Sequence, residues 1–407
     1  MSRDNFGNLR KVSWSRSGRT DKGVHAAAQL VSLKMTYPNG GEEETIKAIN
    51  QFLPEDIRVV DIKRTPKSFD ARTRCSGRRY EYIMPTFLLA PKSDVAALFE
   101  EAAALEKSQG GTHAALDGAG EDASLSVAAP RNQPCLEEGA LNRDASVDAI
   151  PAVAGVEAGA EIATGQRDVV AAGAAGDVDG GDDAEADADE AVRRLESVEL
   201  SSPAVVQRVA ERLQGYRLPP ESLKALRETL NDFVGTKNYH NYTNHKQPTD
   251  PSCQRRVYHL LVTAFKAADP FEKEGLEWVR LTVEGQSFIL HQIRKMVAST
   301  VDRVRGQSSS EDFKKSFDLV KMNLGIAPSE GLYMERPLYE IHNKHMKQQG
   351  AEDRALEWET GPAAEALEEF KTLKIHAGIL AQERKDHDFV GWLDRFTRYP
   401  CNYSHYL

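Results

Sequence analysis

The sequence predicts an α+β protein whose strands form a mainly antiparallel sheet with flanking helices. Strand patterns and helix patterns are mixed within each ordered part of the chain, and the steps between successive strands are often short. Parallel strands need a crossover of a dozen or more residues, so short steps favour antiparallel pairing. With 407 residues, the chain can also bury a large core and form two or more domains.

The first ordered region, residues 1–90, is predicted to contain one helix and three strands. Apolar residues recur at helical spacing in residues 42–54, which predicts a helix with Ile46 and Ile49 facing inward. Alternating, β-branched or aromatic runs predict strands at 27–35, 57–65 and 78–85.

Residues 91–200 are predicted to be a disordered insertion. The segment is rich in Ala, Gly, Asp and Glu, is poor in aromatic residues and lacks an apolar stripe. Such a composition cannot bury enough apolar surface to offset the entropy of ordering the chain.

The second ordered region, residues 201–345, is followed by a charged tail with helical patterning, residues 346–407. Leucines at helical spacing predict a helix in 220–234, and a capping box at Ser309–Asp312 predicts the start of another. Strands are expected at 255–265 and 276–285, and an amphipathic helix at 288–305.

The net charge of −10 conceals an uneven distribution along the chain. Residues 100–190 hold 21 acidic and 4 basic side chains, a net of −17, so the remainder has a net charge of +7. A basic remainder gives modest support to polyanion binding. Since no long apolar run or secretory signal is visible, we expect an intracellular protein without a membrane segment. The four cysteines are far apart and form no CxxC pair, which argues against a disulfide framework or a cysteine zinc site.

The stretch "SGRTDKGVH", residues 17–25, holds a carboxylate between two cations and two glycines. Glycines allow a sharp turn and a close approach to a bulky partner, and Arg19 and Lys22 should keep Asp21 ionised. An ionised, desolvated carboxylate can act as a nucleophile. On local composition alone, the simpler interpretation of Asp21 as a turn-capping residue is favoured.

Two later stretches add candidate partners for RNA and for Asp21. In residues 69–85, arginines that suit phosphate binding alternate with aromatic residues that suit base stacking, although an ordinary edge strand fits equally well. Arg294 lies three residues after His291 in an otherwise apolar helix, where a cation needs an anion such as Asp21. The alternative is that Arg294 faces solvent.

Five stretches together resemble the TruA-type tRNA pseudouridine synthases, particularly the eukaryotic branch that modifies several tRNA positions. In chain order they are "SRSGRTDKGVHAAAQLVSLK", "FDARTRCSGRRYEYIMPT", "GTKNYHNYT", "VEGQSFILHQIRKMV" and "PSEGLYMERPLY". They occur in the family's order and cover most of the chain outside the insertion and tail. One stretch would be weak support, whereas five in order make the resemblance specific.

The resemblance implies isomerisation of uridine to pseudouridine in RNA without a cofactor or metal. The family's catalytic aspartate falls on Asp21, and its base-stacking tyrosine falls on Tyr80. The arginine that pairs with the aspartate falls on Arg294, and the arginine that helps hold the flipped-out nucleotide falls on Arg19. Whether Asp21 attacks the sugar, attacks the base or first accepts a proton stays open. Additional RNA contacts are expected from Lys22, Arg78, Arg79 and His291.

The family fold implied by the resemblance consists of two ferredoxin-like halves that form one extended sheet with a central basic cleft. The family carries a strand and helix before the aspartate loop, and here only "MSRDNFGNLRKVSWSRSG" precedes it, so we expect a truncated start. We expect a monomer rather than a homodimer, in the nucleus, with mitochondrion and cytoplasm as alternatives. The expected partner is tRNA, with small nuclear and messenger RNAs as alternative substrates.

Two other functions compete with this interpretation. A catalytically inactive or truncated RNA-binding homologue would present the same surface without turnover. A carboxylate hydrolase is disfavoured, because it needs a second acid or a metal near Asp21 and the sequence offers no strong candidate.

Overall fold

The computed structural model describes residues 9–36, 41–113, 200–265, 275–399 and 401. Its contacts gather Met1–Gly111 and Gly180–Leu407 into one compact unit. The other unit, Thr112–Asp179, lies almost wholly outside the described residues. Among the described residues, no helix is both long enough and apolar enough to cross a membrane.

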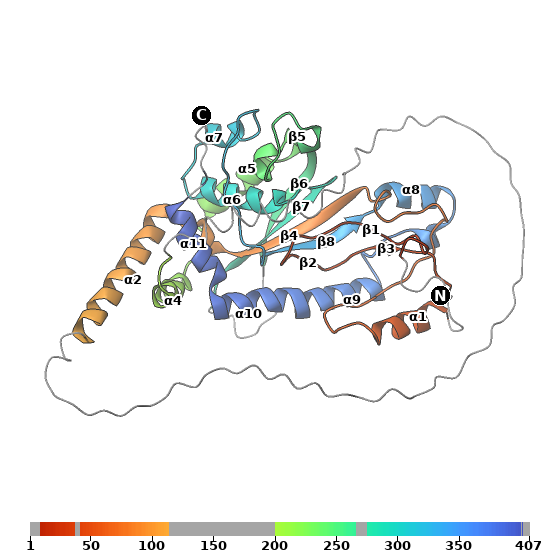
Figure 1. Cartoon of the computed structure of the whole chain (residues 1–407), viewed down its shortest axis with the longest axis horizontal. Helices are drawn as coiled ribbons and strands as arrows, with labels where there is room; N and C mark the ends of the chain where they lie inside the picture. The colour runs from red at the N-terminus through yellow and green to blue at the C-terminus, as the bar shows by residue number, and fades with distance from the viewer. Residues whose placement is uncertain (1–8, 37–40, 114–199, 266–274, 400, 402–407) are drawn as a thin grey trace, which may run out of the picture. The chain divides into compact units, whose positions relative to one another are not determined.

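Six of the described strands form one mixed sheet in the order β2-β8-β4-β7-β6-β5 (Figure 1). All neighbours pair antiparallel except β2 and β8, which run parallel. These strands are β2 (His25–Ala26), β4 (Gly77–Pro85), β5 (Gly235–Asn238), β6 (Gln254–Phe265), β7 (Trp278–Gly285) and β8 (Leu332–Leu338). A separate two-stranded sheet pairs β1 (Ser15–Arg16) with β3 (Val31–Ser32).

Strand β4 lies between β8 and β7 and joins the two ordered regions of the sequence in one sheet. Tyr80 pairs with Val283 on one side and with Met334 on the other. Side chains alternate across a strand, so Tyr80 and Tyr82 share one face of the sheet while Arg79 and Glu81 share the other. The candidate site lies on the face of the sheet that carries the side chains of Tyr80 and Tyr82.

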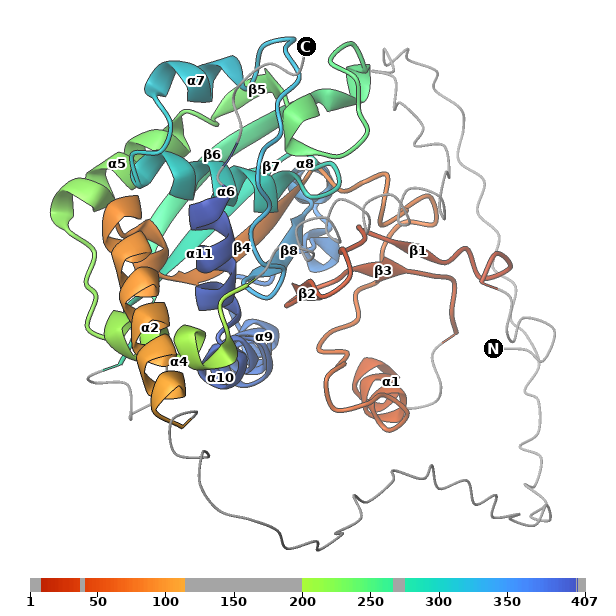
Figure 2. The ribbon, with the colours of Figure 1, turned by 60° about the vertical axis from the view of Figure 1, so that its left-hand side comes forward.

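Helices cover both faces of this sheet (Figures 1 and 2). Helices α5 (Pro220–Asn231) and α6 (Gln292–Val304) lie on one face, and α9 (Pro362–Phe370) and α10 (Ala377–Asp386) run along the other. A π-helical segment, Lys371–His376, connects α9 to α10. The remaining described helices of four or more residues are α1 (Gly41–Asn50), η2 (Thr86–Leu89), α2 (Lys92–His113), α4 (Pro203–Leu213), α7 (Ser310–Lys315), α8 (Glu340–Gln348) and α11 (Asp388–Arg398). Three short 3₁₀ turns complete the set: η3 (His240–Tyr242), η4 (Pro251–Cys253) and η6 (Glu352–Arg354).

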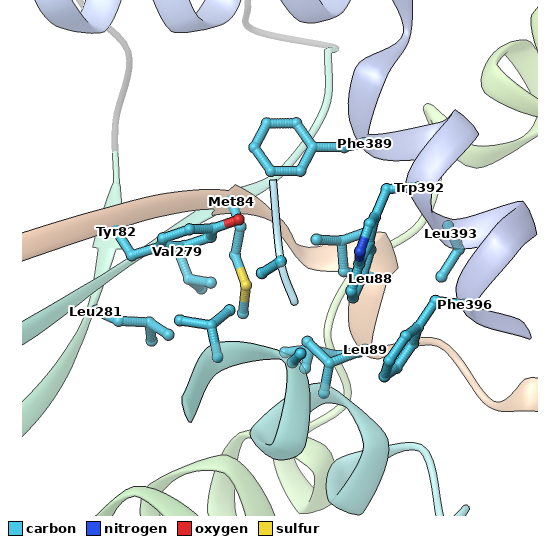
Figure 3. Packing of buried hydrophobic residues seen from close by; sticks show 14 of the residues in the cluster. Tyr82, Met84, Leu88, Leu89, Val279, Leu281, Phe389, Trp392, Leu393 and Phe396 are labelled. Atoms are coloured by element: carbon cyan, nitrogen blue, oxygen red, sulfur yellow. The ribbon is translucent and has the colours of Figure 1, made fainter. Parts of the chain in front are cut away.

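The C-terminal helices are part of the hydrophobic core. Figure 3 shows Trp392 of α11 beside Leu88 of η2, in one cluster with Phe389 of α11 and Met84 of β4. Trp392 also donates an indole hydrogen bond to the carbonyl of Ile326 over 2.7 Å. The helical patterning predicted for the tail is confirmed, and α11 closes the core at the end of β4.

Several predicted elements are confirmed and one is wrong. The strands expected at 78–85, 255–265 and 276–285 are β4, β6 and β7, and Ser309 caps α7 by accepting the N–H of Asp312 over 3.0 Å. No strand forms at 57–65. There, the main-chain N–H of Val59 bonds to the side chain of Asn50 over 2.8 Å rather than to a neighbouring strand.

Other expectations hold only in part. The strand expected at 27–35 is reduced to the two residues of β3. Helix α1 forms as expected, but Ile46 and Ile49 are only half-buried. Helix α6 begins at Gln292, four residues later than expected.

The first part of the predicted disordered insertion is helical. Helix α2 buries Val95, Phe99 and Ala102 in the main core. Its Glu101 forms an ion pair with Arg212 of α4 over 2.6 Å. The expectation of disorder is therefore wrong for the residues of α2, and the rest of the predicted insertion up to residue 199 lies outside the described residues.

Candidate active site

The loop that carries Asp21 is held between two strands and closed by a tight turn. The N–H of Val24 donates to the carbonyl of Asp21 over 3.0 Å, and Gly23 has a φ of +78°. A positive φ at the third position of such a turn favours glycine. The next residues, β2, pair with β8, so one end of the loop is fixed to the main sheet.

Arg78 fixes the other end of the loop. Its guanidinium donates to the carbonyl of Ser17 over 2.7 Å and to the carbonyl of Gln286 over 3.0 Å. The Ser17 hydroxyl also bonds to the side chain of Gln29, whose amide donates to the carbonyl of Gly18 over 3.1 Å. Arg78 thus joins the aspartate loop to the turn after β7, and both acceptors of its guanidinium are main-chain carbonyls of the protein.

Asp21 is half-buried, and its environment moves its pKa in opposing directions. Burial raises the pKa, and this is the largest effect. A hydrogen bond from the main-chain N–H of His291 and the charge of Arg294 lower it by smaller amounts. The pKa of Asp21 therefore lies above its ordinary value, because burial outweighs the two effects that lower it. Arg19 and Lys22 are exposed, and the shift in the pKa of Asp21 arises from burial, His291 and Arg294.

Arg294 reaches the same region from the first turn of α6. Its Nε donates to the carbonyl of Ala327 over 2.6 Å, and its own carbonyl accepts the N–H of Ala327 over 3.2 Å. The negative charges of Glu330 and Asp21 both favour the charged guanidinium, with Glu330 the stronger of the two. Among the described side chains, no ion pair within 4.0 Å joins Arg294 to Asp21, so the two interact at longer range.

Tyr80 forms the aromatic side of the site. Its ring meets that of Phe288 edge to face, with centroids 5.4 Å apart. Burial raises the pKa of the Tyr80 hydroxyl to about 12, and the charge of Asp21 contributes to the same upward shift. The hydroxyl is therefore neutral at physiological pH, and the ring lies close enough to Asp21 to feel its charge.

His291 connects the site to the loop that follows β5. Its Nδ1 lies 3.3 Å from the side-chain amide nitrogen of Asn244, so Nδ1 accepts and Nε2 carries the proton. Burial, with the charges of Arg294 and Lys295, lowers the pKa of His291 to about 4. The imidazole is thus neutral near pH 7, and any RNA contact from it would be a hydrogen bond rather than an ion pair.

The predicted site residues fall into two groups. Asp21, Tyr80, Arg294 and His291 are brought together from three distant parts of the chain. Arg79 lies on the opposite face of the sheet, where it pairs with Glu284 over 2.8 Å. The functional roles assigned to all of these residues remain predictions.

The sequence reasoning assigned no role to the loop before β8, although it lines the site. The carbonyl of Pro328 accepts the Tyr82 hydroxyl over 3.0 Å, and Ser329 packs against Gly23. Glu330 supplies the charge that acts on Arg294. The motif "PSEGLYMERPLY" was the available signal, but the contact of Pro328 uses a main-chain carbonyl that composition does not reveal.

This arrangement suits chemistry by a carboxylate on an aromatic substrate. Asp21 lies where a main-chain N–H at the start of α6 and the charge of Arg294 both favour its anion. Tyr80 offers an aromatic group beside it. Within the described residues, no cluster of three or more His, Cys, Asp and Glu side chains is arranged to hold a metal ion.

Comparison with known proteins identifies the family. The family model described as tRNA pseudouridine synthase matches residues 230–340. The chain is 32% identical to tRNA pseudouridine synthase 1 of Yarrowia lipolytica over 98% of its own length and 67% of that protein. It is 31% identical to tRNA pseudouridine synthase 1 of Saccharomyces cerevisiae, covering 86% of this chain and 56% of that protein.

A human relative extends the comparison beyond fungi. Pseudouridylate synthase 1 homolog of Homo sapiens is 27% identical over 95% of this chain and 60% of the human protein. The chain thus spans between 56% and 67% of the length of these three relatives. With Asp21, Tyr80 and Arg294 gathered at one place and these matches along nearly its whole length, the chain belongs to the tRNA pseudouridine synthase family.

Proposed function

We propose that this chain converts uridine to pseudouridine in tRNA, with Asp21 as the essential carboxylate. The observation that carries the proposal is the convergence of Asp21, Tyr80 and Arg294 at the start of α6. The curated relatives are named for this activity, which supports the same substrate class. In the reaction, the bond from C1′ to N1 breaks, C5 bonds to C1′, and the proton leaves C5 while N1 gains one. No other reactant is consumed.

The side chains divide the work in this proposal. The target base leaves its stack, and Tyr80 stacks against it, which offsets part of the cost of unstacking. Arg294 lowers the pKa of Asp21 and opposes the effect of burial. Exposed Arg19 and Lys22, on the same loop, contact the RNA phosphates. His291 donates from Nε2 to the nucleotide.

The finer architecture belongs to the same proposal. The two ordered regions are two ferredoxin-like halves joined at β4 and β7, and the basic cleft between them receives the RNA. Their pairing in one mainly antiparallel sheet supports this division. We infer a monomer in the nucleus that acts on tRNA, with Arg78 holding the aspartate loop in place, whereas the RNA contact predicted for Arg79 is not part of the proposal, because Arg79 pairs with Glu284 on the opposite face of the sheet.

The proposal is tested by mapping pseudouridine in unmodified tRNA after incubation with purified protein. Wild type should form pseudouridine, and Asp21→Asn should lower the rate by at least about a thousandfold, because a nucleophile or base is lost. Binding of tRNA should change by less than about threefold, since the substitution preserves the size of the side chain.

The matched control is Asp56→Asn, which neutralises an exposed carboxylate in the same region of the chain. It should leave both rate and binding unchanged. Full activity in Asp21→Asn would end the proposed role of Asp21. Binding without any pseudouridine in wild type would favour a non-catalytic RNA-binding protein.

A further inference from the structure

Leu290 is an exposed apolar side chain next to the candidate active site. It occupies the turn between β7 and α6, directly before His291, and 39% of its surface is exposed. Its neighbours Phe288 and Ile289 pack against the main core, whereas Leu290 contributes to no described part of that core. Single exposed leucines are common on protein surfaces, so a role for Leu290 depends on its position beside the candidate site.

The turn that presents Leu290 is held rigidly. The N–H of Ile289 donates to the side-chain oxygen of Gln292 over 3.0 Å, and the N–H of Gln292 donates to the carbonyl of Ile289 over 3.0 Å. His291 adopts a φ of +61°, a left-handed conformation that is costly for a residue with a side chain. The structure therefore maintains a strained turn that fixes the direction of the peptide following Leu290.

The same turn places Leu290 close to Asp21. The main chain of His291 lies close enough to Asp21 to lower the pKa of its carboxyl. Leu290 is the residue directly before His291, so it is adjacent to this part of the site. On the other side of the turn, Phe288 packs against Tyr80. An exposed leucine thus borders the place where a flipped-out uridine would lie.

We propose that Leu290 enters the RNA base stack as an apolar wedge and fills the space that the target uridine leaves. Proteins that unstack bases often insert apolar side chains between base steps, which offsets the lost stacking. The wedge acts on the stacked RNA, while Tyr80 and Asp21 act on the extruded nucleotide. This inference rests on the proposed function and adds a positioning residue that promotes extrusion.

The test compares two tRNA transcripts that differ only opposite the target uridine located by mapping. In one, the uridine pairs with adenosine; in the other, it faces a mismatched cytidine and is already partly unstacked. Single-turnover rates are measured at saturating protein for wild type, Leu290→Ala, Leu290→Met and Leu290→Gln. Since unstacking costs a few kcal/mol, Leu290→Ala should slow the paired transcript by about tenfold to a hundredfold. It should slow the mismatched transcript by less than about threefold.

The other variants separate a wedge from a structural effect. Leu290→Met keeps an apolar side chain of similar size and should retain most of the rate, whereas Leu290→Gln keeps the size and should resemble Leu290→Ala. Leu319→Ala, at a leucine that is 68% exposed, is the matched control and should behave as wild type on both transcripts. Equal losses on the two transcripts, or no loss on either, would overturn the wedge. Inactivity of wild type on both transcripts would instead reject the proposed function.

Discussion

Three effects act on the pKa of the Asp21 carboxyl, and they differ in sign. Burial disfavours the anion most strongly, while the N–H of His291 and the charge of Arg294 favour it. Arg294 is itself subject to opposing effects, because burial lowers its pKa while Tyr82, Glu330 and Asp21 raise it. At Asp21 the pKa is raised, because burial outweighs the two effects that favour the anion.

This balance predicts the pH dependence of the reaction. In the proposed reaction the anion of Asp21 is the active form, so the rate should be fully present above its raised pKa and should fall as the pH drops through that pKa. Replacing Arg294 by Gln removes a charge that lowers the pKa, so the acidic limb should move to higher pH. The rate at neutral pH should fall by about tenfold to a hundredfold, as expected when a preorganised charge is lost.

Rate profiles at saturating tRNA, extended from neutral pH into the acidic range as far as the protein stays folded, check this prediction. Arg294→Lys retains the charge and should leave the acidic limb near its wild-type position, even if the rate falls. An acidic limb that does not move in Arg294→Gln would show that Arg294 does not influence the ionisation of Asp21.

At the scale of elements, the sequence predicted three of the four strands that pair on both sides, β4, β6 and β7, whereas β8 was not predicted. Strand β4 has neighbours on each edge, and its alternating pattern was recognised. Residues 57–65 have a similar pattern without forming a strand, because the Val59 N–H finds the Asn50 side chain. An alternating apolar and polar pattern indicates an extended, half-buried backbone. It does not indicate whether another strand lies beside that backbone.

In the candidate site, too, some residues were predicted from the sequence and others were not. Asp21, Tyr80 and Arg294 were identified because charged and aromatic residues stand out in sequence and match a known family. The loop before β8 was overlooked, because Ala327 and Pro328 act through main-chain carbonyls. Such contacts depend on how elements pack, and no residue type specifies them.

Gly331 shows how tightly this loop is packed at the start of β8. A Cβ at Gly331 would lie 2.5 Å from the carbonyl oxygen of Ile83 and 3.0 Å from the ring of Tyr82. Since the nearest atom is main chain, β8 and β4 would have to separate. We expect Gly331→Ala to lower the free energy of unfolding by about 1–3 kcal/mol, the usual cost of overpacking. Chemical denaturation of the full chain measures this change.

Gly378 provides the matched control. It lies in α10, and a Cβ there would meet no atom within 4 Å. Gly378→Ala should therefore leave the stability unchanged or raise it by up to about 1 kcal/mol, because alanine favours helix more than glycine does. If both variants have the same stability, close packing at Gly331 does not constrain the junction of β8 with β4.

At the scale of the whole molecule, acidic and basic side chains are unevenly distributed along the chain. Residues 114–199 contain 20 acidic and 5 basic side chains, so the rest of the chain has 42 acidic and 47 basic residues, a net of +5. Helix α2 belongs with this basic remainder, because Val95 and Phe99 are buried in its core. The boundary that matters for stability is thus after α2 rather than at residue 91.

This division predicts the outcome of replacing residues 114–199 with a ten-residue Gly/Ser linker. Ser202 bonds to Glu106 over 2.6 Å, and the seven residues from Glu106 to His113 rise about 10 Å along α2. A flexible linker of ten residues spans about 17 Å, which is enough to rejoin the chain. The variant should therefore keep a thermal midpoint within about 3 °C of wild type and should still form pseudouridine.

The same variant should bind tRNA more tightly at low salt, because its net charge changes from −10 to +5. The gain in affinity should disappear near 1 M salt, where the Debye length is about 3 Å and charges on the two molecules are screened from each other. A comparison variant that lacks residues 95–199 also loses the buried Val95, Phe99 and Ala102, so it should unfold at a lower temperature. Equal stability of the two variants would contradict the placement of α2 in the core, and unchanged affinity at low salt would contradict the electrostatic role of the acidic segment.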